Sequence, residues 1–405
     1  MTDRVIPIRL MGSMPASAPR PVAPPPLALY VHVPWCVRKC PYCDFNSHPQ
    51  RGPLPEGPFL AALIADLEAA LPDIWGRRVV SLFIGGGTPS LLSPQAVDGL
   101  LAAVRARLSC APGMEITLEA NPGTVEAARF AGFRAAGVNR LSLGVQSFAD
   151  GQLRALGRIH DGDGARRALA IARKVFDRVN VDLMYALPGQ TPELALADVE
   201  TALAFDPTHL SCYELTIEPN TAFAHEPPAL PDEDCAADIH DAIESRLLAA
   251  GWEHYEVSAY ARPGHACTHN LNYWRFGDYL GIGPGAHSKL TMPDGIRRAL
   301  RHPHPDAYLS RAGKSDFLQS QHRVPAEDLP VEFMLNALRL ADGFEFELFE
   351  ARTGLPFATL QSDLEGFAAQ GLVTLNEGRV RPTARGFRLA NTMLAALLDR
   401  RHQEP

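Results

Sequence analysis

The feature that most constrains the fold of this chain is a regular alternation between short apolar runs and segments with helical spacing. Six runs rich in apolar and β-branched residues are each followed by a segment whose apolar residues recur every three or four positions. Repeated strand–helix units imply parallel strands joined by right-handed crossovers. Six units rather than eight predict an α/β fold, an open, partial (βα)6 barrel. The predicted strands span residues 29–33, 79–84, 116–120, 140–145, 179–184 and 209–216, and the predicted helices lie near 60–71, 94–104, 124–136, 163–175, 192–204 and 232–250.

The loop between the first predicted strand and the first predicted helix carries three closely spaced cysteines. Cys36, Cys40 and Cys43 have the spacing Cys-x3-Cys-x2-Cys, and three thiolates on one short loop suit an iron–sulfur cluster or a zinc ion. No fourth cysteine follows in the loop, so a four-iron cluster held here keeps one iron open. A Cys3His zinc site that uses His32 or His48 is the alternative. It is disfavoured because zinc loops usually pair a Cys-x2-Cys knuckle with a second, distant pair, which this sequence lacks.

Polar residues occur at the ends of the next predicted strands. A glycine run, 85–87, follows the second strand; it lacks the spacing of a dinucleotide or phosphate-binding loop but permits a close approach of backbone to a ligand. Glu119, Gln146 and Asp182 occupy matching positions on the third, fourth and fifth strands. A plain glycine turn or a structural hydrogen-bond network would explain each feature alone. Together they predict a polar ligand in the barrel mouth, because barrels of this type bind ligands at the carboxyl ends of their strands.

A second motif lies beyond the predicted barrel, where residues 267–274 read Cys-Thr-His-Asn-Leu-Asn-Tyr-Trp. A histidine beside aromatic residues is commonly a packed core residue. The functional interpretation is an axial haem ligand at His269, because neutral imidazole binds iron and aromatic side chains form an apolar wall for a porphyrin. Cys267 is an alternative thiolate ligand. The Cys-x2-Cys-His motif is absent, so a thioether-linked haem of the c type is not predicted.

Both motifs resemble those of a known superfamily. Tyr-x-His-x-Pro-x-Cys-x3-Cys-x2-Cys at 30–43 resembles the radical S-adenosylmethionine (SAM) superfamily, in particular the oxygen-independent coproporphyrinogen III oxidases and the related HemW-type haem chaperones. His-Asn-x2-Tyr-Trp at 269–274 resembles the haem-binding signature of these chaperones. The oxidases carry a fourth cysteine at the position of Phe45, a difference that also favours the chaperones. The resemblance covers residues 28–390, most of the chain.

The resemblance implies a haem chaperone that binds haem, a [4Fe-4S] cluster and SAM, and that transfers haem to an acceptor protein, for example a membrane-bound respiratory protein. It implies no catalytic residue and leaves open whether SAM is cleaved. The alternative is an oxidase-like radical SAM enzyme that performs oxidative decarboxylation of a porphyrinogen. A radical enzyme that modifies nucleic acid is disfavoured, because the chain has a net charge of -8 and no basic stripe.

The resemblance also implies roles for individual residues. Three irons of the cluster would be held by Cys36, Cys40 and Cys43, and SAM would bind the fourth iron. The positions that match SAM-binding residues are Tyr30, His32, Tyr42, Gly86, Gly87, Thr88, Glu119, Gln146, Arg158, Asp182 and Thr216. The positions that match the haem signature are His269, Asn270, Tyr273 and Trp274.

Composition divides the chain into four predicted parts. Residues 1–27 resemble a disordered Pro/Ala-rich tail, 28–250 form the partial barrel, 251–325 contain the haem signature and a linker, and 326–400 form a mostly helical, winged-helix-like cap domain. The acidic segment 362–365 indicates docking rather than DNA binding.

The sequence contains no run of eighteen apolar residues and therefore predicts no membrane span, while peripheral membrane contact stays compatible with it. Seven cysteines without a secretory signal predict reduced thiols in the cytoplasm.

Overall fold

The computed structural model describes residues 23–124 and 126–403, and a twelve-stranded mixed sheet organises most of them. Its strand order is β14-β13-β12-β11-β1-β4-β5-β6-β7-β8-β10-β9. The six predicted strands lie side by side in sequence order and are parallel, which confirms the predicted partial barrel. They are β1 (Leu27–Val33), β4 (Arg78–Gly86), β5 (Ser109–Ala120), β6 (Arg140–Gln146), β7 (Arg178–Tyr185) and β8 (His209–Glu214).

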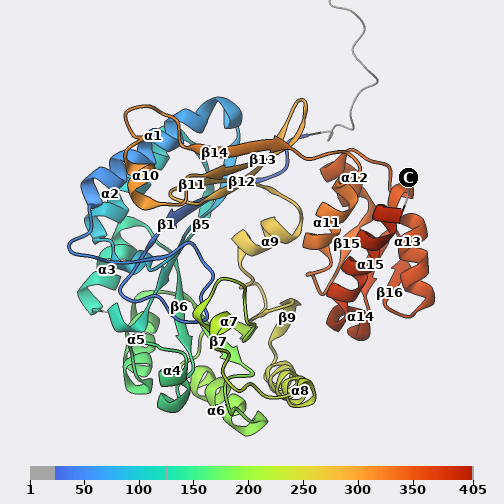
Figure 1. The fold of residues 1–405 in the computed structure, drawn as a ribbon, viewed down its shortest axis with the longest axis horizontal. Helices are drawn as coiled ribbons and strands as arrows, with labels where there is room; N and C mark the ends of the chain where they lie inside the picture. The colour runs from blue at the N-terminus through green and yellow to red at the C-terminus, as the bar shows by residue number, and fades with distance from the viewer. Residues whose placement is uncertain (1–22, 125, 404–405) are drawn as a thin grey trace, which may run out of the picture.

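The helices that connect these strands form an arc along the outer face of the curved sheet (Figure 1). They are α1 (Glu56–Ile74), α2 (Pro94–Arg107), α3 (Ala127–Ala136), α5 (Gly162–Val175), α6 (Pro192–Leu203) and α8 (Glu233–Ala249). The α2 helix begins at Pro94 because Ser93 caps it: the Ser93 side chain accepts a hydrogen bond from Ala96 N at 3.1 Å. The connections also contain β2 (Trp35–Cys36), β3 (His48–Pro49), η1 (Pro89–Leu91), η2 (Pro122–Thr124), α4 (Asp150–Ala155) and α7 (Ala222–His225).

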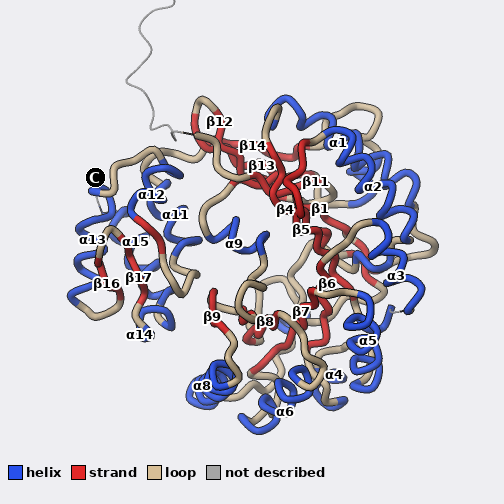
Figure 2. Tube along the Cα trace, turned by 180° about the vertical axis from the view of Figure 1, so that it is seen from behind, coloured by secondary structure: helices blue, strands red, loops and turns tan. Residues whose placement is uncertain are grey.

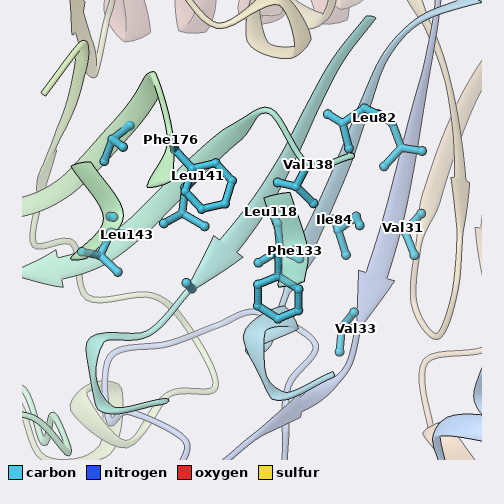
Figure 3. Packing of buried hydrophobic residues seen from close by; sticks show 14 of the residues in the cluster. Val31, Val33, Leu82, Ile84, Leu118, Phe133, Val138, Leu141, Leu143 and Phe176 are labelled. Carbon is cyan, nitrogen blue, oxygen red and sulfur yellow. The ribbon is translucent and has the colours of Figure 1, made fainter. Parts of the chain in front are cut away.

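Side-chain alternation along the parallel strands separates an apolar outer face from a polar interior. Val31, Leu82, Leu118 and Leu141 belong to one buried cluster, to which α3 contributes Phe133 (Figure 3). Successive residues of a strand point to opposite faces of the sheet. The residues next to these apolar positions therefore point into the barrel, which gathers the polar strand residues on one interior surface.

The predicted linker at 290–325 is wrong, because this segment contains the end of one strand and two complete strands of the main sheet. The sequence did not show this because all side chains of the edge strand β14 are exposed, so the alternation of apolar and polar residues is missing. In β13 the buried Arg301 occupies a core position and pairs with Asp66 at 3.2 Å. The elements here are β11 (Asp278–Ile282), which is parallel to β1, followed by β12 (His287–Met292), β13 (Gly295–Arg301), α10 (Pro305–Leu309) and β14 (Leu318–Arg323).

The opposite edge of the sheet also extends past the predicted barrel boundary. Two antiparallel strands, β9 (Glu253–Glu256) and β10 (Ala259–Ala261), extend this edge, and β10 pairs with β8. The predicted boundary at residue 250 is therefore wrong. The second motif lies on α9 (Thr268–Trp274), which is placed on the open side of the barrel, between the sheet and the C-terminal region (Figure 1, Figure 2).

The C-terminal region is a mostly helical unit with its own core, as predicted, and that core includes Phe333, Phe349 and Leu360. In the predicted winged-helix-like domain, β16 (Val373–Asn376) and β17 (Arg379–Pro382) pair antiparallel as a hairpin. The predicted tail at 1–27 lies mainly outside the described residues, and Leu27 already belongs to β1. The elements are α11 (Leu329–Ala337), β15 (Phe344–Glu345), α12 (Phe346–Thr353), α13 (Ala358–Ala369), β16 (Val373–Asn376), β17 (Arg379–Pro382), α14 (Ala384–Arg388) and α15 (Ala390–Gln403).

Candidate functional site

A cavity of about 340 Å³ opens at the carboxyl ends of the parallel strands, beside the cysteine loop. Parallel barrels bind ligands at this end because the loops that follow the strands converge there. Most of the residues predicted to hold the cluster and SAM lie in the cavity wall. They are Cys36, Cys40, Tyr42, Cys43, Gly86, Gly87, Thr88, Glu119, Gln146, Arg158, Asp182 and Thr216.

The cysteine loop is fixed at its base by backbone pairing and by one asparagine. β2 and β3 pair in parallel, Trp35 with His48, and bring the two ends of the loop together. The Asn46 side-chain amide donates to the carbonyl oxygens of Pro284 and Pro303, both at 2.9 Å. These bonds tie the loop to the turn after β11 and to the segment before α10. The loop thus presents its three free thiols from a fixed base.

The sulfur positions disfavour a single zinc ion held by the three cysteines. Thiolate ligands of one tetrahedral zinc lie about 3.8 Å apart, because each Zn–S bond is about 2.3 Å long. Within the described part of the chain, the three loop sulfurs do not all lie within 4.8 Å of one another. The two histidines considered for zinc, His32 and His48, each direct Nε2 at an oxygen atom of Asn46, at 2.8 and 3.2 Å. The geometry therefore disfavours the Cys3His alternative.

The glycine run after β4 packs against the start of the cysteine loop. Gly87 N donates to Val33 O and Thr88 N donates to Trp35 O, both at 2.7 Å. Gly86 has a left-handed φ of +109°, and a Cβ atom at Gly87 would lie only 2.5 Å from Trp35 O. Glycine is required here because a side chain would push the two segments apart. The close packing brings the backbone of the turn to the cavity wall.

Two polar residues reach the cavity from the end of β6 and the segment beyond it. Gln146 has a φ of +72°, a left-handed conformation that costs energy in a residue other than glycine and clusters at functional sites. The Arg158 guanidinium lies 3.6 Å from Cys40 Sγ and 3.4 Å from Tyr42 Oη, and it donates to Gly144 O at 2.6 Å. Its Nε is buried and has no hydrogen-bond partner in the described residues. Arg158 is thus placed to receive an anionic group of a ligand beside the cysteines.

Two buried carboxyl groups, Glu119 on β5 and Asp182 on β7, lie in the cavity wall. Glu119 accepts a hydrogen bond from Gly86 N at 3.1 Å. Asp182 accepts bonds from Ser142 Oγ at 3.2 Å and from Asn180 Nδ2 at 2.7 Å. Burial, and secondarily the charge of Asp182, raise the pKa of Glu119 to about 8, and burial also raises the pKa of Asp182. The pair therefore favours a ligand that brings positive charge or hydroxyl donors.

We expect Glu119→Gln to stabilise the ligand-free protein, and to do so increasingly as the pH rises. The Glu119 carboxyl has a pKa of about 8 in the folded state against an ordinary 4.5, so the wild type loses stability as the pH rises between these values. Glutamine removes the charge and keeps an acceptor for Gly86 N. The gain in the free energy of unfolding, measured by denaturant titration, should be on the order of 1–3 kcal/mol at alkaline pH and near zero at acid pH. An equal gain at both pH extremes, or the same trend in the exposed control Glu126→Gln, would contradict this explanation.

Tyr30 and His32, also predicted to bind SAM, lie behind the cavity wall. Tyr30 Oη and His32 Nδ1 are 3.1 Å apart, and His32 Nε2 bonds to Asn46 O at 2.8 Å. A Cβ atom at Gly86 would meet the His32 ring at 2.6 Å, so the ring packs directly under the glycine turn. In this structure both side chains support the loop and the turn, and their contact with SAM stays a prediction.

The cavity wall also includes Arg38, Asn121, Met184, Tyr213 and Glu218, which sequence reasoning did not single out. Met184 and Tyr213 lie near the carboxyl ends of β7 and β8. Strand position alone would have indicated them, because residues at this end of a barrel strand commonly line the site. The other three lie in loops, whose paths were not predictable from local sequence.

The haem signature lies on α9, which is anchored to β5 through one carboxylate. Glu115 accepts hydrogen bonds from the backbone N of Thr268 at 3.2 Å and of His269 at 3.1 Å. The His269 side chain is buried, and its Nδ1 lies 3.1 Å from Ser81 Oγ on β4. Burial lowers the pKa of His269 to about 4, so the imidazole is neutral near neutral pH. A neutral imidazole is the form that binds iron.

Aromatic rings surround His269 from three elements. The ring centres of Phe83, Tyr273 and Tyr30 lie 5.0, 5.1 and 6.4 Å from that of His269, and Trp274 lies 6.4 Å beyond Tyr273. The structure therefore gathers three predicted haem residues, His269, Tyr273 and Trp274, into one aromatic cluster. The fourth, Asn270, is half-buried on the same short helix.

The alternative ligand Cys267 is less suited to iron than His269. Its side chain is completely buried, and its Sγ lies 3.3 Å from Glu115 Oε1. Burial raises the pKa of the Cys267 thiol to about 12, which opposes formation of the thiolate that metals bind. The geometry therefore favours the imidazole.

Comparison with known proteins first defines the class. Residues 30–201 match the radical SAM superfamily, and residues 324–389 match the HemN C-terminal domain. The structure of coproporphyrinogen III oxidase (HemN) from Escherichia coli, a radical SAM enzyme, is similar with a TM-score of 0.78 at 25% identity, over 92% of this chain and 90% of that one. The fold and the three-cysteine cavity thus define a radical SAM protein.

Sequence similarity then identifies the family within this class. The chain is 49% identical to heme chaperone HemW of Escherichia coli (strain K12) over 92% of this chain and 98% of that protein, and 45% identical to heme chaperone HemW of Haemophilus influenzae over the same shares. This chain belongs to the HemW family of heme chaperones.

None of the helices in residues 23–124 and 126–403 has the length and apolar character needed to cross a bilayer.

Proposed function

We propose that this protein is a haem chaperone, which binds haem reversibly and passes it to an acceptor protein. The observation that carries the proposal is His269, a neutral imidazole packed among the aromatic rings of the signature in a chain of the HemW family. Iron takes a neutral imidazole as a ligand, and aromatic side chains pack against a porphyrin. Because only 5% of His269 is exposed, haem entry requires a shift of α9 or of the C-terminal region beside it.

The proposal includes a [4Fe-4S] cluster on Cys36, Cys40 and Cys43 and a SAM molecule in the cavity. It is supported by the three free cysteines in the cavity wall and by the buried Nε of Arg158, which has no hydrogen-bond partner in the described residues. The cluster, when bound, supplies one-electron chemistry next to SAM. The chain's own residues bind and orient: Arg158 neutralises a carboxylate beside Cys40, and the buried carboxyls hold hydroxyl or ammonium groups.

The acceptor is proposed to be a protein that lacks its haem, for example a respiratory protein at the membrane. A cytoplasmic location is part of the proposal. It is supported by the cysteines, because all seven are free thiols, and free thiols persist in reducing compartments.

The structural similarity to HemN raises a second candidate function, an oxidase-like activity. Phe45 is the residue that favours the chaperone over the oxidase. Phe45 is 57% exposed at the cavity, at the position where the oxidases carry a fourth cysteine. We expect the anaerobically reconstituted protein, given SAM, a reductant and coproporphyrinogen III, to yield no decarboxylated product by mass spectrometry. The haem-loaded protein should instead lose its haem to an added apo-cytochrome, followed by absorbance. Multiple turnovers of decarboxylation without haem transfer would overturn the proposal.

A further inference from the structure

The C-terminal region places an arginine directly over the haem signature. Arg339 follows α11, and its segment is fixed to β9 by two backbone bonds, Val257 N to Arg339 O at 3.0 Å and Ala341 N to Tyr255 O at 3.1 Å. The guanidinium carbon lies 4.5 Å from the ring centre of Trp274, the last residue of the signature. The C-terminal region thus contributes a positive charge beside Trp274.

Among the described residues, the Arg339 guanidinium lacks an anionic partner at hydrogen-bond distance. Its side chain is 33% exposed, and the nearest carboxylate oxygen, on Glu256, lies 3.9 Å away. In residues 23–124 and 126–403, no acceptor bonds to its Nε, and the buried Nε1 of Trp274 is a second donor without a partner. Arg298, on the other side of the signature, differs because it is bonded to Tyr279 Oη and paired with Glu332. Unpartnered buried donors are costly and favour an acceptor that arrives with a ligand.

The cluster combines an imidazole, aromatic rings and a guanidinium, which suit the iron, the macrocycle and the propionates of haem. The ring centre of Tyr273 lies 5.1 Å from that of His269 and 6.4 Å from that of Trp274, and the Arg339 guanidinium carbon lies 4.5 Å from the Trp274 ring centre. Haem has iron at its centre, an apolar macrocycle around it and two propionate carboxylates at one edge. A guanidinium binds a carboxylate through two parallel hydrogen bonds and stacks on an aromatic face at the same time.

We propose that Arg339 binds a propionate carboxylate of haem, so that the C-terminal region completes the haem site rather than only covering it. This inference rests on the proposed function. Glu256 is the competing group, because its carboxylate lies nearest to the guanidinium and its Oε2 has no hydrogen-bond partner among the described residues. A bound propionate replaces this weak contact with a bidentate one.

The test compares haemin with haemin dimethyl ester, which has the same iron and macrocycle but no free carboxylates. Both are titrated into the full-length, cluster-reconstituted protein, as wild type, Arg339→Gln and Arg385→Ala. Glutamine keeps an amide over Trp274, and Arg385 is an exposed arginine of the C-terminal region that bonds to Gln370 O. We expect Arg339→Gln to weaken haemin binding about 10-fold or more, to leave ester binding unchanged, and Arg385→Ala to match the wild type. Glu256→Gln should tighten haemin binding, because it removes the competing charge.

The outcomes separate this inference from the function on which it rests. A wild type that fails to bind either compound contradicts the haem chaperone itself. A wild type that binds haemin while Arg339→Gln binds it equally well overturns the role of Arg339 alone. An equal loss of haemin and ester in a variant with unchanged melting temperature also overturns it, because that result assigns Arg339 a packing role.

Discussion

Replacing Cys40 with alanine is expected to remove nearly all visible absorbance of the iron–sulfur cluster while leaving haem binding close to that of the wild type. The loop offers three thiolates, and a cluster that loses one keeps too few protein ligands to stay bound. Haem binding should persist because His269 is held on α9 by Glu115 and Ser81, which precede the cavity residues Glu119 and Gly86 on β5 and β4. Ser81, the partner of His269, precedes Gly86 of the cavity by five residues on β4, about 16 Å at 3.3 Å per residue.

The measurement is an absorbance and iron determination after anaerobic reconstitution, followed by a haemin titration. The control is Cys235→Ala, which removes a cysteine on α8 that is not part of the loop. A variant Cys40→Ala that retains a full cluster would contradict the assigned ligands. Equal loss of cluster and haem would show that the two sites depend on each other more strongly than their separation predicts.

Replacing His269 with alanine should weaken haem binding about 100-fold or more and leave the cluster absorbance unchanged. Removing a residue that merely orients a metal ligand lowers the affinity for the metal by about 10–100-fold. Removing the ligand itself is expected to lower the affinity for haem at least as much. The substitution also removes a buried ring that packs on Phe83 and Tyr273, so a loss of stability could imitate a loss of ligation.

Added imidazole separates these two explanations. In His269→Ala, free imidazole can enter the space of the lost ring and bind the iron, so the Soret band of bound haem should return as imidazole is added. A packing defect would not be restored in this way. His265→Ala, which removes a partly exposed histidine just before α9, is the matched control and should bind haem normally. Unaltered haem affinity in His269→Ala would assign the ligand elsewhere.

Local sequence predicted the parallel half of the fold because each element carries its own physical signal. The apolar runs of β1 and β4 are buried on their helix-facing side, and Ser93 before Pro94 marks the start of α2. β14 gave no such signal because it is an exposed edge strand, and β13 has the ion-paired Arg301 at a buried position.

The candidate site was predictable where topology alone brings residues together. Glu119 and Gln146 end neighbouring parallel strands, so their meeting in one cavity follows from the strand order. Asn46 and Arg339 were not predictable, because their importance depends on contacts with distant segments: the turn at Pro284 and the ring of Trp274. Such contacts arise only from tertiary packing.

The most direct test of the account is an anaerobic absorbance titration of the reconstituted wild-type protein with haemin. The account predicts a saturable Soret band that reaches its plateau near one equivalent of haemin and is distinct from that of free haemin. A linear increase without saturation, with the spectrum of free haemin, would show that the chain has no specific haem site and would contradict its assignment as a haem chaperone.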